Sequence, residues 1–199
     1  LAEARAAQRK APGEPLGFAL EGAVLAAQKK WPEAERAYRQ ALAKRATPGG
    51  VIELATALER QGKSVQADAL TRDWIQRNGQ DVAVRTFLAE RALLKQDYAG
   101  AARLYKTLLE LRPDDVIALN NLAWAAGNAN DPEALRYAEQ AYALAPQNPA
   151  VLDTYGMLLA ARGEPARGVE LLRAAVALAP ELHVLRLNLA KALSDAGAK

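Results

Sequence analysis

The 199-residue sequence contains no cysteine, one histidine, one methionine and two phenylalanines. The absence of cysteine excludes disulfide bonds and thiolate metal sites. The single histidine, His183, has no serine or cysteine in a recognisable nucleophile motif near it, and no glycine-rich phosphate-binding motif occurs. No metal-ligand cluster can be assembled from this composition. We therefore predict a protein that is not an enzyme and that holds no metal or cofactor.

The sequence also lacks a long apolar run and a strong excess of one charge. No apolar run reaches the roughly 18 residues that span a bilayer, so we expect no insertion of this segment into a membrane. The net charge is only +3, the basic residues are interleaved with acidic ones, and no nucleic-acid-binding motif occurs. Nucleic-acid binding is therefore not expected. Residues 1–45 are basic and residues 114–147 acidic, which either orients a partner or reflects solvated outer helix faces.

A small residue in a helical setting recurs every 33 or 34 residues. These residues are Ala34, Ala67, Ala101, Ala134 and Gly168. A period of this size is typical of a two-helix repeat that buries its apolar face by stacking on its neighbours. A second set of small residues recurs upstream of the first, in the middle of the preceding helix. It comprises Gly22, Ala55, Ala89, Ala123 and Gly156. We interpret both sets as points at which paired helices approach closely.

Proline marks the end of most of the units. Pro48, Pro113, Pro146 and Pro180 each follow a second helix, and proline cannot continue a helix because it lacks the N–H and clashes with the preceding turn. The second repeat departs from this pattern, since it ends at 78–79 (Asn-Gly) without a proline and carries a tryptophan in place of a small residue. We expect its packing on the third repeat to be the least regular.

The spacings predict an all-α fold, a right-handed α-solenoid of antiparallel helix pairs that forms one array over residues 1–199. The expected parts are 1–13 as the tail of a preceding repeat, then repeats 15–47, 48–80, 81–114, 115–147 and 148–181, and 182–199 as the first helix of a sixth repeat. Because the array begins and stops within a repeat, we expect a fragment of a longer protein whose cut ends can self-associate.

Segments such as LEGAVLAAQKKWPEAERAYRQALAKRATP and YGMLLAARGEPARGVELLRAAVALAP resemble the tetratricopeptide repeat (TPR) family in their pattern of small, aromatic and terminal proline residues. The resemblance covers nearly the whole chain. It implies a superhelix that binds a protein or peptide partner as a non-catalytic scaffold. The motif residues are packing residues, so the resemblance says more about the fold than about the function.

A narrower resemblance involves residues 120–124 (NNLAW), 130–139 and 145–154. These stretches are similar to TPR-repeat lipoproteins of the PEP-CTERM/exosortase system. That resemblance implies a bacterial envelope assembly for exopolysaccharide production or surface-protein sorting, on the periplasmic side, with any lipid anchor in a segment outside this sequence. Two alternatives stay open: a cytoplasmic location, and the non-catalytic TPR arm of a larger enzyme or polysaccharide-export protein.

In a superhelix of this type, the first helix of each pair lines the concave face. Helical spacing from the small residues predicts a partner-binding row there. The row comprises Asn120, Asn121, Trp124, Asp153, Met157, Asn188 and Lys191. Asparagine can donate and accept at once and so can bind the backbone of an extended peptide, and a tryptophan is a strong anchor. Alternatively, the asparagines satisfy loop backbone and Trp124 fills space between units. A groove for a sugar polymer is a second hypothesis, although the row holds only one aromatic residue.

Overall fold

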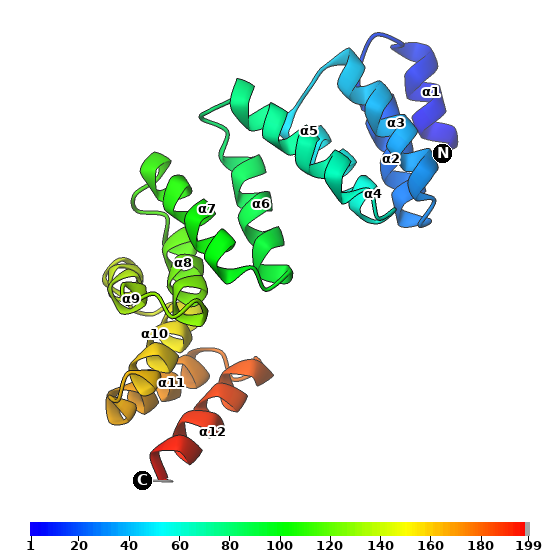
Figure 1. Ribbon diagram of the computed structural model, residues 1–199. Helices are drawn as coiled ribbons and strands as arrows, with labels where there is room; N and C mark the ends of the chain where they lie inside the picture. The colour runs from blue at the N-terminus through cyan, green and yellow to red at the C-terminus, as the bar shows by residue number, and fades with distance from the viewer. Residues whose placement is uncertain (198–199) are drawn as a thin grey trace. The chain divides into compact units, whose positions relative to one another are not determined.

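The computed structural model describes residues 1–197, which form twelve α-helices and no strand. The helices are α1 (Ala2–Lys10), α2 (Leu16–Ala27), α3 (Trp31–Lys44), α4 (Pro48–Glu59), α5 (Ser64–Arg77), α6 (Val82–Leu94), α7 (Tyr98–Leu111), α8 (Val116–Asn128), α9 (Ala134–Leu144), α10 (Pro149–Ala161), α11 (Pro165–Leu178) and α12 (His183–Gly197) (Figure 1). The all-α prediction is confirmed. Within this range no helix combines the length and the apolar character needed to cross a bilayer.

Polar side chains and prolines define where several helices begin. The side chains of Thr47, Asp97, Asp115 and Asn148 accept hydrogen bonds from backbone N–H groups in the first turns of α4, α7, α8 and α10. Such caps satisfy amides that have no partner inside the helix. Proline occupies one of the first two positions of α3, α4, α10 and α11, where its missing N–H costs nothing.

The turn inside each helix pair contains one residue in the left-handed region. These residues are Lys29, Gly62, Gln96, Asn130 and Gly163, with φ between 57° and 92°. Each lies seven residues after the small residue in the middle of its first helix. Left-handed backbone directly after a helix satisfies its last carbonyls and reverses the chain. The turn therefore repeats with the same period as the helices, although only two of the five positions hold glycine, the residue that adopts this conformation most easily.

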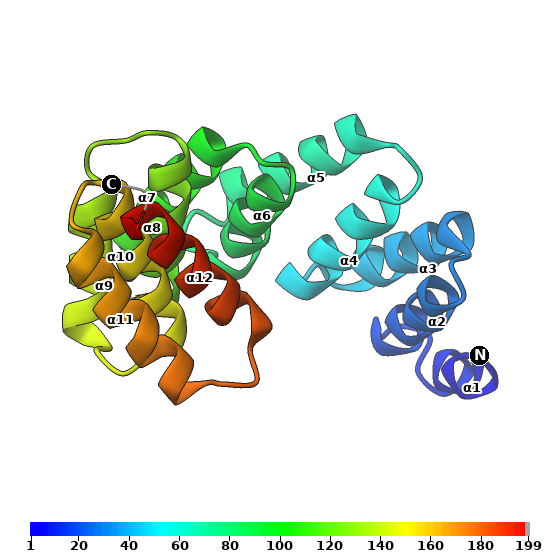
Figure 2. The same cartoon turned by 90° about the horizontal axis from the view of Figure 1, so that it is seen from below.

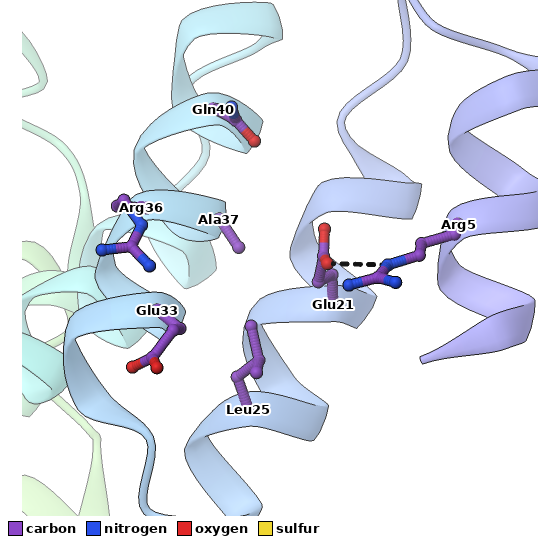
Figure 3. A pocket seen from close by; sticks show the side chains of 7 residues that line it. All are labelled: Arg5, Glu21, Leu25, Glu33, Arg36, Ala37 and Gln40. Atoms are coloured by element: carbon purple, nitrogen blue, oxygen red, sulfur yellow. Dashed lines mark hydrogen bonds and ion pairs between the residues drawn. The ribbon is translucent and has the colours of Figure 1, made fainter.

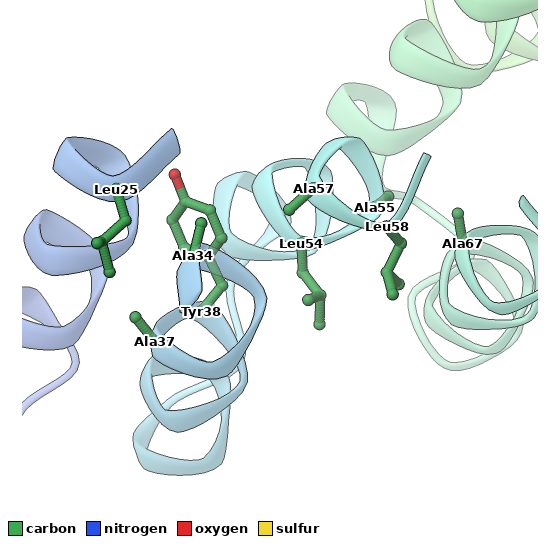
Figure 4. Close-up of a cluster of buried hydrophobic side chains, with 9 residues drawn as sticks. All are labelled: Leu25, Ala34, Ala37, Tyr38, Leu54, Ala55, Ala57, Leu58 and Ala67. Carbon is green, nitrogen blue, oxygen red and sulfur yellow. The ribbon is translucent and has the colours of Figure 1, made fainter. Parts of the chain in front are cut away.

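Two compact units divide the chain, residues 1–87 and residues 88–199. In the first unit, α2 packs on α3, α3 on α4, and α4 on α5, while α1 packs on α2. Its core is a cluster of small and medium-sized apolar side chains (Figure 4). The cluster comprises Leu25, Ala34, Ala37, Tyr38, Leu54, Ala55, Ala57, Leu58 and Ala67. Five of these nine residues are alanines with almost no exposed surface, so the helix backbones approach closely.

A buried carboxylate ties the first unit together. Glu35 of α3 accepts hydrogen bonds from Arg39 Nε at 2.9 Å, from Gln61 Nε2 at 2.9 Å and from Lys63 Nζ at 2.7 Å. Burial alone would raise the pKa of Glu35, but the hydrogen bonds and charges of these neighbours outweigh it and lower the pKa to about 2. Because Gln61 and Lys63 lie in the turn between α4 and α5, this carboxylate joins consecutive helix pairs.

The end of α5 shows what replaces the missing proline. The indole N–H of Trp74 donates to Asp81 Oδ2 at 2.9 Å, and the backbone N–H of Val84 donates to Asp81 Oδ1 at 2.9 Å. One carboxylate therefore fixes the end of α5 and the start of α6. Trp74, which breaks the small-residue pattern, supplies a hydrogen bond that a small side chain would lack.

In the second unit, neighbouring helices from α7 to α12 pack on each other in chain order, and each first helix also contacts the next first helix, α8 with α10 and α10 with α12 (Figures 1 and 2). The recurring small residues lie at the contacts: Ala89, Ala101, Ala123 and Ala134 have no exposed surface. The tightest contact joins α10 and α11. A Cβ built on Gly168 would lie 2.5 Å from the carbonyl oxygen of Gly156 and 3.0 Å from the backbone nitrogen of Ala160.

Replacing Gly168 with alanine is expected to lower the free energy of unfolding by about 1–3 kcal/mol, because the added methyl group meets rigid backbone atoms. Urea denaturation followed by circular dichroism would measure this. Gly49→Ala is the matched control, since a Cβ there meets nothing within 4 Å, and it should be neutral or stabilising by up to about 1 kcal/mol. Equal stability of the Gly168→Ala variant and the parent would contradict the close contact.

Replacing Glu35 with glutamine is expected to cost about 1–3 kcal/mol at pH 7, through the loss of charge-assisted hydrogen bonds. The folded pKa of Glu35 is about 2 against an ordinary 4.5, so its stabilisation is complete above pH 4.5 and is lost as the pH falls toward 2. The stability difference between parent and variant should therefore shrink over that window. Glu33→Gln, on the same helix, should show no such difference; a constant gap from pH 7 to pH 2 would refute the assignment.

Candidate functional site

The predicted partner-binding row lies on three first helices of the second unit, α8, α10 and α12. Exposed and half-buried residues of these helices make a surface that we call the α8–α10–α12 face. It comprises Ile117, Asn120, Asn121 and Trp124 on α8, Asp153 and Met157 on α10, and Val184, Leu187, Asn188 and Lys191 on α12. Because α8 contacts α10 and α10 contacts α12, residues at the same position of the repeat occupy neighbouring places on adjacent helices.

Large apolar side chains are exposed on both outer helices of this face. On α8, Ile117 is 69% exposed and Trp124, two turns later, 41%. On α12, Val184 is 56% exposed and Leu187 69%. Only Trp124 was among the residues predicted from the sequence. The other three follow helical spacing on the same face, i to i+7 on α8 and i to i+3 on α12. This spacing in the sequence could therefore have identified them.

Asn121 is engaged within the unit. Its side-chain Nδ2 donates to the hydroxyl of Tyr105 at 3.1 Å. Burial raises the pKa of Tyr105, the hydrogen bond from Asn121 lowers it in part, and the negative charge of Glu90 raises it further. This contact was not expected. The sequence predicted that the amide binds a partner or, alternatively, satisfies loop backbone. Asn121 instead links α7 to α8 and positions the tyrosine hydroxyl.

Asn188 and Asp153 form a pair between α12 and α10. Asn188 Nδ2 donates to both oxygens of Asp153, at 2.8 Å and 3.1 Å. Both side chains are half-buried. Burial raises the pKa of the Asp153 carboxyl, and the hydrogen bond from Asn188 lowers it only in part. The sequence predicted both residues as independent ligands of a partner, whereas the structure makes Asn188 the residue that orients Asp153.

The remaining predicted residues differ in how accessible they are. Lys191 is exposed. Met157 is half-buried and packs against a cluster that includes Val169 and Leu172, so much of it belongs to the core. The Oδ1 atom of Asn120 is buried and has no hydrogen-bond partner within residues 1–197, so that oxygen is not accessible to a partner. Spacing alone could not separate these cases, because each depends on how neighbouring helices pack.

Two grooves lie elsewhere, one within each unit. The first, of about 260 Å³, lies among α1, α2 and α3 and is lined by both acidic and basic side chains (Figure 3). Arg5 Nε donates to Glu21 Oε1 there at 3.3 Å, and Gln8 Nε2 donates to Glu21 Oε2 at 2.7 Å, so the carboxylate is already occupied. In the same groove, Glu33 and Arg36 of α3 lie across from this pair (Figure 3).

The second groove, of about 300 Å³, lies among α7, α8 and α9 and is more apolar. It is lined by Lys106, Leu109, Glu110, Pro113, Leu119, Leu122, Tyr137 and Gln140. Lys106 Nζ lies 3.2 Å from Asp131 Oδ2 and 5.5 Å from the centre of the Tyr137 ring. Asp131 accepts a backbone hydrogen bond from Glu133, which lowers its pKa. The cation of this groove is thus already paired.

Residues that could bind a metal do not come together: within residues 1–197 no group of three or more histidine, aspartate or glutamate side chains is placed to hold one. His183 is exposed and its Nδ1 contacts the side chain of Arg186. The site that the structure assembles is therefore a surface with apolar, amide and carboxylate groups. Such a surface can bind by contact and hydrogen bonding.

Asp153→Asn is expected to be more stable than the parent at pH 7. The folded pKa of Asp153 is raised above its ordinary 3.8, so the folded protein prefers the uncharged carboxyl and loses stability as the pH rises through that pKa. Asparagine removes this cost, and the two proteins should converge below pH 3.8. Urea denaturation at pH 7 and pH 3 would test this difference in stability, with Glu170→Gln as the surface control. If Asp153→Asn were less stable than the parent at pH 7, the charged carboxyl would not lower the stability and the prediction would be wrong.

Comparisons with known proteins bear on the fold. No family model matches the sequence, and no curated protein matches it. Among solved structures, the chain resembles TTC0263, a thermophilic TPR protein of Thermus thermophilus, with a TM-score of 0.62 and 17% identity over 90% of this chain and 98% of that one. It resembles yeast Tom70 with a TM-score of 0.76 and 16% identity over 98% of this chain.

A third neighbour is YrrB, described as a TPR protein with an unusual peptide-binding site, with a TM-score of 0.67 and 15% identity over 94% of this chain and 97% of that one. The chain spans 42% of the Tom70 chain. At these identities the likeness shows the fold alone. The chain therefore has the fold of a TPR α-solenoid, as the repeat spacing predicts, and this supports the resemblance to the TPR family.

Proposed function

We propose that this TPR-fold chain is a non-catalytic protein-interaction scaffold whose α8–α10–α12 face holds an extended segment of a partner protein. The observation that carries the proposal is the exposure of four large apolar side chains on one face of one unit: Ile117, Trp124, Val184 and Leu187. Apolar side chains gathered on a surface and interspersed with polar groups are typical of a protein-binding site.

The regular spacing of the first helices also supports this proposal. Neighbouring first helices present equivalent positions at regular intervals, which suits a partner whose side chains also repeat at regular intervals, as in an extended chain. YrrB, which has this fold, is described as carrying a peptide-binding site. Of the surfaces described above, the α8–α10–α12 face is the one that combines exposed apolar anchors with a carboxylate, that of Asp153, whose hydrogen-bond donor is a neutral amide.

The place of the scaffold is a further part of the proposal. We propose a bacterial envelope assembly, concerned with exopolysaccharide production or surface-protein sorting, on the periplasmic side. The resemblance of residues 120–124, 130–139 and 145–154 to lipoproteins of the PEP-CTERM/exosortase system supports it. Fractionation of the native bacterium, with detection of the tagged full-length protein, tests it. Recovery only with cytoplasmic markers would exclude this location while leaving the binding face unaffected.

Replacing Trp124 with alanine is expected to weaken binding of the partner segment at least tenfold, because a large rigid ring buries much surface at small entropic cost. Peptides selected from a random library on the purified parent protein serve as probes, and fluorescence anisotropy gives their Kd. Asn121→Ala should weaken binding less, by about two- to tenfold, by freeing Tyr105.

Leu178→Ala is the matched control for Trp124→Ala. Leu178 is 50% exposed but lies on α11, a second helix of the same unit. It should leave the Kd unchanged. If Leu178→Ala weakened the selected peptides as much as Trp124→Ala, the binding surface would lie on the second helices and the proposed face would be wrong.

A further inference from the structure

Asp153 is a half-buried carboxylate that no cation among the described residues neutralises. Its hydrogen-bond donor is the neutral amide of Asn188. Burial is the largest cause of the shift of its pKa, the hydrogen bond from Asn188 opposes it, and no lysine or arginine of residues 1–197 is among the causes. A carboxylate has about four acceptor sites, and a single amide nitrogen cannot use them all. The group therefore keeps the capacity to accept from a further donor.

The environment favours a charged donor over a neutral one. Burial of a carboxylate without an opposite charge costs free energy, and a cation brought to it recovers part of that cost. Asp153 is held in place by Asn188 and by its position on α10, so little is lost in ordering it when a ligand arrives. Lys191, which is exposed on α12, disfavours a second cation at that end of the face.

Apolar anchors lie on both sides of this carboxylate. Ile117 and Trp124 are exposed on α8, and Val184 and Leu187 on α12, with α10 between the two helices. Packed helices are separated by about 8–10 Å, and a chain in the extended polyproline II conformation advances about 3.1 Å per residue, with three residues per turn. One step from helix to helix therefore corresponds to about three residues of such a partner, and side chains three residues apart point the same way.

We propose that the α8–α10–α12 face selects an extended segment in the polyproline II conformation, in which an arginine or lysine is flanked, about three residues away on each side, by an apolar side chain. The cation pairs with Asp153, and the apolar residues cover α8 and α12. Arginine suits the site best, because its planar guanidinium can donate two parallel hydrogen bonds to a carboxylate. This inference rests on the proposed function of the face and adds the chemistry of its partner.

The test uses two synthetic peptides with blocked ends and a fluorophore, Leu-Ser-Ser-Arg-Ser-Ser-Leu and the same sequence with glutamine in place of arginine. Anisotropy titration of the full chain should give about tenfold tighter binding for the arginine peptide. The protein has a net charge of +3, so its overall field works against a cationic peptide. A preference for arginine therefore has a local source, which the variants identify.

Variants assign the preference to Asp153. Asp153→Asn should abolish the discrimination between the two peptides, whereas Glu170→Gln, which removes the same charge from α11, should leave it intact. Asp153→Lys should bind a third peptide, with glutamate at the central position, more tightly than the arginine peptide. Circular dichroism checks that each variant keeps its helices, and the comparison of peptides on the parent protein needs no variant at all.

The outcomes separate this inference from the proposed function. If the arginine and glutamine peptides bound the parent equally, and Trp124→Ala weakened both, the face would bind segments without selecting a cation and only the inference would fail. If discrimination persisted in Asp153→Asn, another group would be its source and the inference would again fail. If neither peptide bound at millimolar concentration while selected peptides bound in a Trp124-dependent manner, the proposed sequence pattern would be wrong.

Discussion

Close approach of helix backbones at the recurring small residues is the constraint on which the other features depend. Where Gly156 and Gly168 meet, the contact between α10 and α11 is so close that a single methyl group has no room. Elsewhere in the units, alanines without exposed surface occupy the equivalent positions. Helices that approach so closely leave little room for large side chains at the contact, so the larger apolar residues fill the space between successive pairs. The repeat is therefore stable mainly through contacts with its neighbours.

That constraint also determines which residues are left for binding. The first helices α8, α10 and α12 pack on the preceding second helices and on one another in chain order, and only one stripe of each remains at the surface. On α8 and α12 the stripe carries exposed apolar side chains, Ile117 and Trp124 on one and Val184 and Leu187 on the other. Exposed apolar surface adds nothing to the stability of the chain alone. The proposed function accounts for its presence on the same face of α8 and α12 by a partner that covers it.

The carboxylates of Glu35 and Asp153 differ in their surroundings and in what they contribute. Glu35 is surrounded by donors from three side chains, two of them cationic, and its pKa falls to about 2. Asp153 has one neutral donor, and its pKa rises. The first stabilises the fold at neutral pH, whereas the second is held at a cost to stability. A charge kept at such a cost on a surface with apolar anchors is suited to binding.

The repeat period, the small residues and the prolines by themselves determined the all-α fold and the succession of helix pairs, because both follow from local spacing. They also identified the register on which Trp124, Asp153 and Lys191 lie. Which members of that register are free was decided only by the tertiary structure. Asn121 and Asn188 use their amides on Tyr105 and Asp153, and Met157 turns partly into the core. The contacts of the two asparagines join residues 16 and 35 positions apart, so they depend on how different helices pack on one another, which the spacing within a helix does not contain.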